Sequence, residues 1–186
     1  MIDVLSLFRE SGALLDGHFR LSSGLHSAGY LQCALVLQHP RHAETLGRAL
    51  AALMPAAAAT AVLSPALGGL IIGHEVARAL GVRAIFAERQ DGVLTLRRGF
   101  RLDGSDRVIV IEDVVTTGGS TRETMEVARQ AGAAVIAAGA IIDRSGGSSD
   151  LGAPFHALVT LALATHPPEA CPQCHAGLPI NKPGSR

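Results

Sequence analysis

The chain has 186 residues, which suits a single domain with a substantial core, and 48% of them are hydrophobic while only 3% are aromatic. Its sixteen basic residues balance its sixteen acidic ones, which argues against a nucleic-acid-binding surface or a membrane-binding face. The first residues lack the basic region and the cleavage site of a secretory signal, and prolines interrupt the apolar stretch between residues 49 and 72. We therefore expect no membrane span. Because the chain also has only three cysteines, we expect a cytoplasmic protein with no disulfide framework.

The elements expected in the first half of the chain alternate between helix and strand. They are a short amphipathic helix, an irregular strand-and-turn segment, a helix, a buried strand and a further helix, at residues 3–15, 17–34, 41–53, 61–64 and 71–82. Asp3 is a possible N-cap of the first helix, which is expected to end near Gly12, and Gly81 is expected to end the last helix.

The second half of the chain predicts strands with one helix among them. The expected strands lie at residues 83–89, 93–100, 108–112, 134–143 and 155–163, and the expected helix lies at 120–132. That helix begins with a capping box of Ser120 and Glu123 and has Gly132 just beyond its end. Because the strands read as buried on both faces, we predict one α/β domain over residues 1–186, with a mostly parallel sheet and covering helices.

Residues 108–123, VIVIEDVVTTGGSTRE, place two carboxylates where a buried strand ends and follow them with a loop of threonine, glycine and serine. The loop precedes a helix N-terminus, whose unpaired N–H groups and positive partial charge favour a bound phosphate. The carboxylates of Glu112 and Asp113 would repel a phosphate alone, but they can accept hydrogen bonds from sugar hydroxyls or hold a divalent cation through them. The stretch therefore predicts a site for a ribose phosphate with Mg²⁺.

Other phosphate-binding motifs do not occur in this sequence, which contains no G-x-x-x-x-G-K-[ST] and no G-x-G-x-x-G. The alternative without function is a plain strand, turn and helix with exposed acids. Adjacent carboxylates at the end of a buried strand are costly, so we favour the ligand-binding interpretation.

The same stretch resembles the ribose-diphosphate signature of type I phosphoribosyltransferases, and IEDVVTTGGSTRE is most similar to the orotate phosphoribosyltransferases. Two further stretches agree with that family, GHFRLSSGLHSAGYLQ at 17–32 and IIDRSGG at 141–147, and the ending CPQCHAGLPINKPGSR resembles a short bacterial branch of it. The resemblance implies a type I phosphoribosyltransferase fold, with a central, mostly parallel sheet flanked by helices, a β-hairpin arm, and a small hood made of residues 1–35 and the C-terminal tail. It also implies a homodimer whose hairpin reaches the neighbouring site.

The activity that the resemblance implies is the transfer of the 5-phosphoribosyl group from phosphoribosyl diphosphate to orotate, with Mg²⁺ held through the ribose and the diphosphate rather than by direct protein ligands. The residues that would bind phosphoribosyl diphosphate are Glu112, Asp113, Val114, Val115, Thr116, Thr117, Gly118, Gly119 and Ser120, with Thr121 at the edge. The residues that would bind orotate are Thr116, Arg144, Tyr30 and Leu31. Arg144 would pair with the orotate carboxylate, because an arginine fork suits a planar acid.

The chain departs from the family where lysines commonly contact the diphosphate, since it has Ser22 and Gly68 at two such positions. Its loop ERQDGVLTLRRGFR, at 88–101, has no lysine and no histidine but contains Arg89, Arg97, Arg98 and Arg101. Because arginine does not deprotonate near neutral pH, it would act as a charge clamp on the leaving diphosphate. We therefore predict Asp113 and Arg89 as catalytic residues. The alternative is that the arginines form only a solvated face of the hairpin.

Two other functions remain open on the sequence. A type I phosphoribosyltransferase for a purine or another base would share the signature, but a neutral purine needs no carboxylate partner such as Arg144. A regulator that senses phosphoribosyl diphosphate without catalysis would fit the missing lysines, but the chain has no DNA-binding appendage and no net basic face.

The tail sequence CPQCH at 171–175 matches the attachment motif of c-type haem, which requires export and does not fit a chain without a signal. It also offers three zinc ligands, Cys171, Cys174 and His175, and a fourth could come from His166 or another subunit. A reduced turn that stabilises the tail is the favoured interpretation.

Three further residues receive structural interpretations. Cys33 is predicted to be a small core residue, and His18 and His26 are predicted to be local hydrogen-bonding groups rather than catalytic ones.

Overall fold

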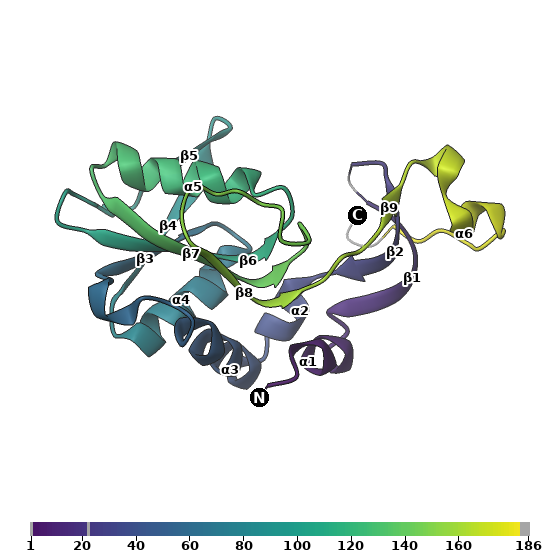
Figure 1. Cartoon of the computed structure of the whole chain (residues 1–186), viewed down its shortest axis with the longest axis horizontal. Helices are drawn as coiled ribbons and strands as arrows, with labels where there is room; N and C mark the ends of the chain where they lie inside the picture. The colour runs from purple at the N-terminus through teal and green to yellow at the C-terminus, as the bar shows by residue number, and fades with distance from the viewer. Residues whose placement is uncertain (1, 22, 183–186) are drawn as a thin grey trace.

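The computed structural model describes residues 2–21 and 23–182, and Figure 1 shows a larger α/β body joined to a smaller β lobe. The helices are α1 (Val4–Glu10), α2 (Cys33–Leu37), α3 (Pro40–Ala51), α4 (Gly69–Leu80), α5 (Gly119–Gln130) and α6 (Pro172–His175), with 3-10 turns at Ala56–Ala58 and Pro168–Ala170. The strands are β1 (Leu14–Arg20), β2 (His26–Leu31), β3 (Ala61–Pro65), β4 (Arg83–Gln90), β5 (Val93–Leu96), β6 (Arg107–Val115), β7 (Ala134–Asp143), β8 (Phe155–Thr160) and β9 (Thr165–His166). None of the described helices is long and apolar enough to cross a bilayer.

The body is built on a six-stranded sheet in the order β5-β4-β3-β6-β7-β8, in which neighbouring strands are parallel except β4 and β5. The central strands consist largely of valine, isoleucine and alanine and are buried on both faces, as a parallel sheet with helices on either side requires. Helices α3 and α4 cover one face and α5 covers the other (Figure 1). The carboxyl ends of β3, β6 and β7 therefore lie at the same edge, where ligands bind in open α/β sheets.

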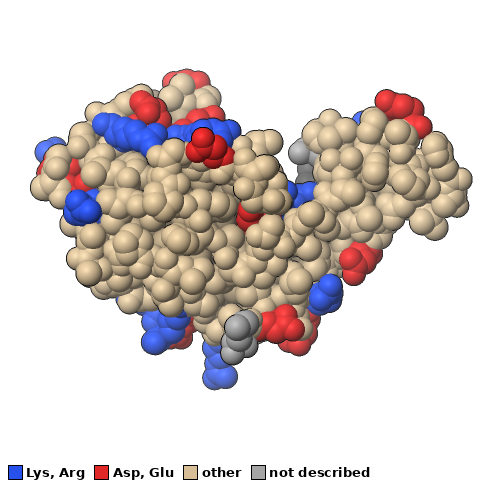
Figure 2. All heavy atoms as spheres, viewed as in Figure 1, with Lys and Arg blue, Asp and Glu red and all other residues tan. Residues whose placement is uncertain are grey.

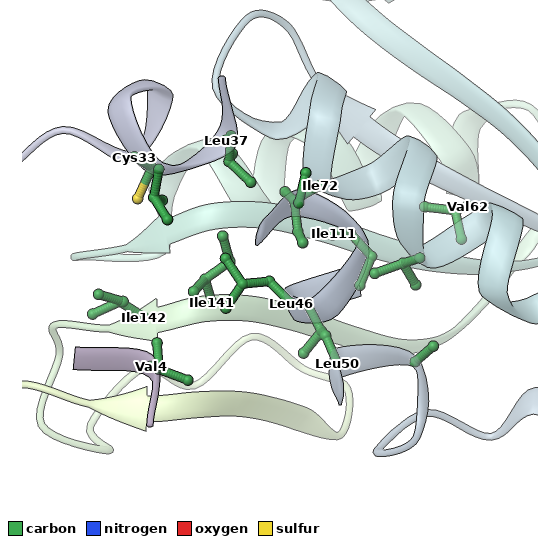
Figure 3. Close-up of a cluster of buried hydrophobic side chains, with 14 of the residues drawn as sticks. Val4, Cys33, Leu37, Leu46, Leu50, Val62, Ile72, Ile111, Ile141 and Ile142 are labelled. Atoms are coloured by element: carbon green, nitrogen blue, oxygen red, sulfur yellow. The ribbon is translucent and has the colours of Figure 1, made fainter. Parts of the chain in front are cut away.

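The core depends on close packing of aliphatic side chains, because the chain has few aromatic residues. On the face covered by α3 and α4, Leu46 packs in one cluster with Ile111 of β6 and Ile141 of β7 (Figure 3). Helices α3 and α4 approach closely at Gly47, where an added Cβ would lie 2.5 Å from the Cβ of Glu75. Only glycine fits at that contact, so a small residue sets the spacing of these two helices.

The smaller lobe, which we call the hood, comprises residues 14–21, 23–31 and 165–182 and contains the antiparallel sheet β1-β2-β9 (Figure 1). The C-terminal tail returns to the N-terminal hairpin through two backbone hydrogen bonds. Asn181 N donates to His18 O at 2.8 Å, and Arg20 N donates to Asn181 O at 2.8 Å. Helices α1 and α2, which flank this hairpin in the sequence, instead contribute side chains to the core of the body.

The expected alternation of helices and strands is confirmed, including three of the predicted helix ends. Asp3 caps α1 by accepting a hydrogen bond from Ser6 N at 3.0 Å. Gly81 is the C-cap of α4 at φ +70°, and Gly132 lies just beyond α5 at φ +87°. These signals were readable because each depends on a few adjacent residues.

Three expectations about individual elements are wrong. No capping box forms at α5, since Gly118 is its N-cap at φ +74° and Glu123 pairs with Arg89 instead. The strand predicted at 93–100 ends at Leu96, because the following turn places Arg98 at φ +57°. The last strand ends at Thr160 rather than continuing to residue 163, and the short helix α2 has no clear signal in the sequence.

Candidate active site

The loop between β6 and α5 forms a small hollow of about 100 Å³ at the carboxyl edge of the sheet. It is lined by Glu112, Val114, Val115, Thr116, Thr117, Gly118, Gly119, Ser120 and Thr121. At Gly118 an added Cβ would lie 2.6 Å from Leu151 Cδ2, and the positive φ also favours glycine. The residues predicted to hold the phosphate are therefore brought together around a helix N-terminus.

The carboxylate of Glu112 is held on the α5 side of the β6 strand. Thr121 Oγ1 donates to Glu112 Oε2 at 2.6 Å, and Thr121 itself is fully buried. Burial raises the pKa of Glu112, while the hydrogen bonds from Thr121 and Ser120 act against that rise. Thr121, which the sequence placed only at the edge of the site, thus orients one of the two acids.

The carboxylate of Asp113 lies on the other side of the strand, because successive side chains of a strand point to opposite faces. It accepts a hydrogen bond from Val114 N at 2.9 Å and interacts with the thiol of Cys33. Burial of the Asp113 carboxyl raises its pKa. The pKa of the Cys33 thiol is raised well above its ordinary value by the burial of that thiol and by the negative charge of Asp113. The buried Cys33 is thus a contact of the site as well as a core residue.

The loop between β3 and α4, at residues 66–68, lies directly against Asp113. It contains a cis peptide bond between Ala66 and Leu67, and the Leu67 side chain is exposed. An added Cβ at Gly68 would lie 2.8 Å from Asp113 Oδ1. Glycine at position 68 therefore leaves room for the Asp113 carboxylate beside this loop.

A larger cavity of about 880 Å³ lies between the hood and the β6–α5 loop. It is lined by Arg20, Leu21, Ser23, Gly24, Leu25, Tyr30, Leu31, Gln32, Thr116, Thr117, Arg144, Thr165 and Lys182. All four residues predicted to contact orotate are in this set. Arg20 and Lys182 also line this cavity, although the sequence did not predict them as site residues. The only indication in the sequence is that each is a basic residue in a segment that resembles the family.

Arg144 is the distinctive group of this cavity. Its backbone N donates to Val115 O at 2.7 Å, and the Asp143 carboxylate accepts from Ser145 N at 2.7 Å and Gly147 N at 3.0 Å, so the loop that carries Arg144 is well supported. Its Nε is buried and has no hydrogen-bond partner in the described part of the chain. Burial lowers the pKa of this guanidinium. An anionic ligand would supply the hydrogen-bond acceptor and the negative charge that this half-buried cation lacks.

The hairpin arginines are not brought to either cavity. Arg89 lies 2.6 Å from Glu123 Oε2 and donates to Gly92 O at 2.6 Å, while Arg98 lies 2.9 Å from Glu88 Oε1. Figure 2 agrees with this pairing, since basic and acidic side chains gather together over α5 instead of forming a patch of one sign. Arg89 pairs with Glu123 of α5, whereas the carboxylate of Asp113 adjoins Gly68. The catalytic role of Arg89 stays a prediction.

A separate cavity of about 730 Å³ lies between the β4–β5 hairpin and α5. Its lining contains Arg122, Glu126 and Leu151 but none of the residues predicted to bind substrate. The candidate site is accordingly the cavity beneath the hood together with the smaller hollow at the β6–α5 loop.

No protein-family model matches the chain. Among solved structures, the orotate phosphoribosyltransferase of Aeropyrum pernix superposes with a TM-score of 0.72 at 26% identity, covering 85% of this chain and 93% of that one. The adenine phosphoribosyltransferase of Trypanosoma brucei shares the fold, with a TM-score of 0.61 at 17% identity over 86% of this chain and 82% of that one. The sheet order and the loop after β6 thus define a type I phosphoribosyltransferase fold.

Curated relatives narrow this class. Orotate phosphoribosyltransferase of Pelotomaculum thermopropionicum is 53% identical over 184 residues, which cover 99% of this chain and 97% of the relative. That of Heliobacterium modesticaldum is 54% identical over 185 residues, which cover 98% and 97%. The chain belongs to the orotate phosphoribosyltransferase family.

Proposed function

We propose that this chain transfers the 5-phosphoribosyl group from phosphoribosyl diphosphate to orotate, giving orotidine 5′-monophosphate and diphosphate. The observation that carries the choice of orotate is the half-buried Arg144, whose Nε lacks a partner among the described residues and which lines the same cavity as Tyr30 and Thr116. The carboxylate of orotate supplies the missing acceptor. A neutral purine would leave the guanidinium uncompensated.

The sugar phosphate then has a place beside the base. The 5-phosphate rests on the N-terminus of α5 at Thr116–Ser120, where unpaired N–H groups point at it. Glu112 and Asp113 accept hydrogen bonds from the ribose hydroxyls from the two sides of the strand end. The remaining diphosphate extends toward residues 66–68, which adjoin Asp113.

Mg²⁺ fits this arrangement as an ion that arrives with the substrate. Within the described part of the chain, the acid pair belongs to no group of three or more potential metal ligands. Mg²⁺ is commonly bound by one or two carboxylates plus substrate phosphates, and Glu112 and Asp113 can hold it through the ribose hydroxyls. When bound there, Mg²⁺ would supply positive charge against the leaving diphosphate.

The reaction needs no nucleophile from the protein. The bond from C1 of the ribose to the diphosphate oxygen breaks, the sugar ring becomes cation-like, and a nitrogen of the pyrimidine forms the new bond to C1. The chain holds the two substrates in line, with Arg144 fixing orotate and the acid pair fixing the ribose. The hood covers the cavity and limits the access of water, which would otherwise hydrolyse the sugar.

The proposed reaction is tested by following orotate absorbance after addition of phosphoribosyl diphosphate and Mg²⁺. We expect absorbance to fall with equimolar release of diphosphate. Consumption of adenine or hypoxanthine in place of orotate would point to a purine enzyme instead. Tight binding of phosphoribosyl diphosphate with no turnover of any base would point to a regulator.

We also propose that the enzyme works as a cytoplasmic homodimer in which the β4–β5 hairpin contributes to the neighbouring site. In that arrangement Arg89 exchanges its ion pair with Glu123 for contact with the leaving diphosphate. Arg89→Ala should then lower turnover by about 10²–10³-fold, as the loss of one charge-stabilising donor does, with little change in the KM for orotate.

Glu123→Gln is the matched control, because it breaks the same ion pair but keeps Arg89. An exposed ion pair contributes only about 0–1 kcal/mol, so we expect nearly normal turnover from this variant. If steady-state kinetics give the same loss for both variants, the pair merely positions the hairpin, and Arg89 is not a charge clamp.

A further inference from the structure

Four potential metal ligands from distant parts of the chain meet in the hood, and we call them the hood cluster: His18 of β1, His26 of β2, Cys171 at the N-cap of α6 and Cys174 within α6. Their nearest ligand atoms all lie within 4.8 Å of one another. His18, His26 and Cys171 are buried and Cys174 is half-buried. In Figure 1, α6 and the tail approach the β1–β2 pair at the end of the hood that lies away from the body.

The distances between the ligand atoms suit a tetrahedral metal site. His18 Nε2 lies 3.1 Å from His26 Nδ1, 3.5 Å from Cys171 Sγ and 3.6 Å from Cys174 Sγ, and His26 Nδ1 lies 3.2 Å from Cys174 Sγ. Zinc bonds of about 2.0–2.1 Å to nitrogen and about 2.3 Å to sulfur place tetrahedral ligands roughly 3.3–3.8 Å apart. One zinc ion therefore fits between these four atoms with small adjustments of the side chains.

The tautomer of His18 is set by a contact outside the cluster. His18 Nδ1 lies 3.0 Å from the carbonyl oxygen of Leu178, which can only accept, so Nδ1 carries the proton. The Nε2 lone pair consequently points into the cluster. A backbone carbonyl that orients a histidine in this way is the usual support of a metal-binding imidazole.

We propose that His18, His26, Cys171 and Cys174 bind one zinc ion in a closed structural site. On binding, the two thiols release their protons to solvent. The charges of the two thiolates then balance the charge of one Zn²⁺, so the occupied cluster has no net charge. This ligand set differs from the one suggested by the sequence: it keeps Cys171 and Cys174 but contains the two histidines of the hairpin instead of His175. His175 Nε2 instead lies 3.1 Å from the carbonyl oxygen of Glu169.

The ion would fasten the tail to the hairpin. Its ligands are separated by up to 156 residues in the sequence, and the hood sheet of three short strands is too small for a core of its own. Beyond the cluster the tail runs to Lys182, which lines the cavity beneath the hood together with Arg20. The zinc site therefore positions the hood side of the orotate cavity. This effect rests on the proposed function, whereas the binding of the metal does not depend on it.

The test is the zinc content of the purified full-length chain after refolding with zinc and gel filtration. We expect about one zinc per chain in the wild type and none in the double variant Cys171→Ser with Cys174→Ser. His175→Ala and Cys33→Ser are matched controls, because they remove the same residue types outside the cluster, and both should keep the metal. Replacement of zinc by Co²⁺ should give thiolate charge-transfer and tetrahedral d–d absorption bands.

The wild-type chain supplies a second readout if the cysteine variants fail to fold. Removal of zinc by a chelator under native conditions should make two further thiols reactive toward a thiol reagent, with release of one zinc. A wild-type chain that holds no zinc, a Cys171–Cys174 disulfide, or metal loss in the His175→Ala control would each overturn the proposal. These readouts do not depend on catalysis, so they stand apart from a failure of the orotate assay.

Discussion

Replacing Arg144 with alanine is expected to remove most of the orotate affinity while the affinity for phosphoribosyl diphosphate stays nearly unchanged. The guanidinium is half-buried, and its Nε has no partner within the described part of the chain. In the proposed complex the carboxylate of orotate is its counterion. Breaking a buried charge-assisted pair typically costs about 2–5 kcal/mol, which corresponds to a loss of about 30- to 5,000-fold in affinity.

Titration calorimetry and the KM for orotate measure this effect, and uracil, which lacks the carboxylate, isolates its cause. Arg144→Ala should lower kcat/KM for orotate steeply and leave the slow reaction with uracil almost unaffected. Arg107→Ala is the matched control, because that arginine bonds to Ala58 O at the opposite end of β6. An equal loss for both acceptors would show that Arg144 supports the loop and does not read the carboxylate.

The double variant Glu112→Gln with Asp113→Asn is expected to lose most of its activity without losing its fold. In the proposed complex each acid accepts hydrogen bonds from ribose hydroxyls, and hydrogen bonds to charged groups contribute about 1.5–3 kcal/mol each. Losing two such bonds lowers kcat/KM for phosphoribosyl diphosphate by about 10²–10⁴-fold. Wild-type kinetics from a folded double variant would contradict the ribose-binding role.

The same variant should be more stable than the wild type near neutral pH. Burial raises the pKa of both carboxyls, so the folded state holds their protons more tightly than the unfolded state does. The resulting contribution to stability is complete below the ordinary pKa of about 4 and is lost as the pH rises through the raised values. The Tm difference between variant and wild type should therefore be largest near pH 7 and shrink toward pH 4.

Glu126→Gln serves as the control for stability, since Glu126 is an exposed acid of α5 that accepts a hydrogen bond from Gln130. Calorimetric scans should give it the same Tm profile as the wild type. A double variant that is less stable than the wild type at pH 7 would mean that Glu112 and Asp113 hold the strand end together, and that their burial is not a cost accepted for function.

The strand, loop and helix at residues 107–130 could be predicted because the interactions that shape them are local. An aliphatic strand, two glycines and the start of a helix need only neighbours in the sequence to define a phosphate-sized cradle. The capping box failed at the same place, because the loop requires Gly118 at positive φ and Glu123 finds a charged partner on the hairpin. The local preference for a capping box is thus outweighed by the loop conformation at Gly118 and by the ion pair between Glu123 and Arg89.

The chemical groups available to this protein can be read from its residues alone: two adjacent acids, a glycine-rich loop, an arginine in a family-like loop and a pair of cysteines in the tail. Which of these groups lie together depends on how the chain folds. The alternation of β6 sends Glu112 and Asp113 to opposite sides, and the pairing of β1 with β2 puts His18 and His26 beside cysteines that are up to 156 residues away. His175 is adjacent to Cys174 in the chain but bonds elsewhere, because closeness in space follows from strand pairing and the path of the tail, which no local sequence pattern encodes.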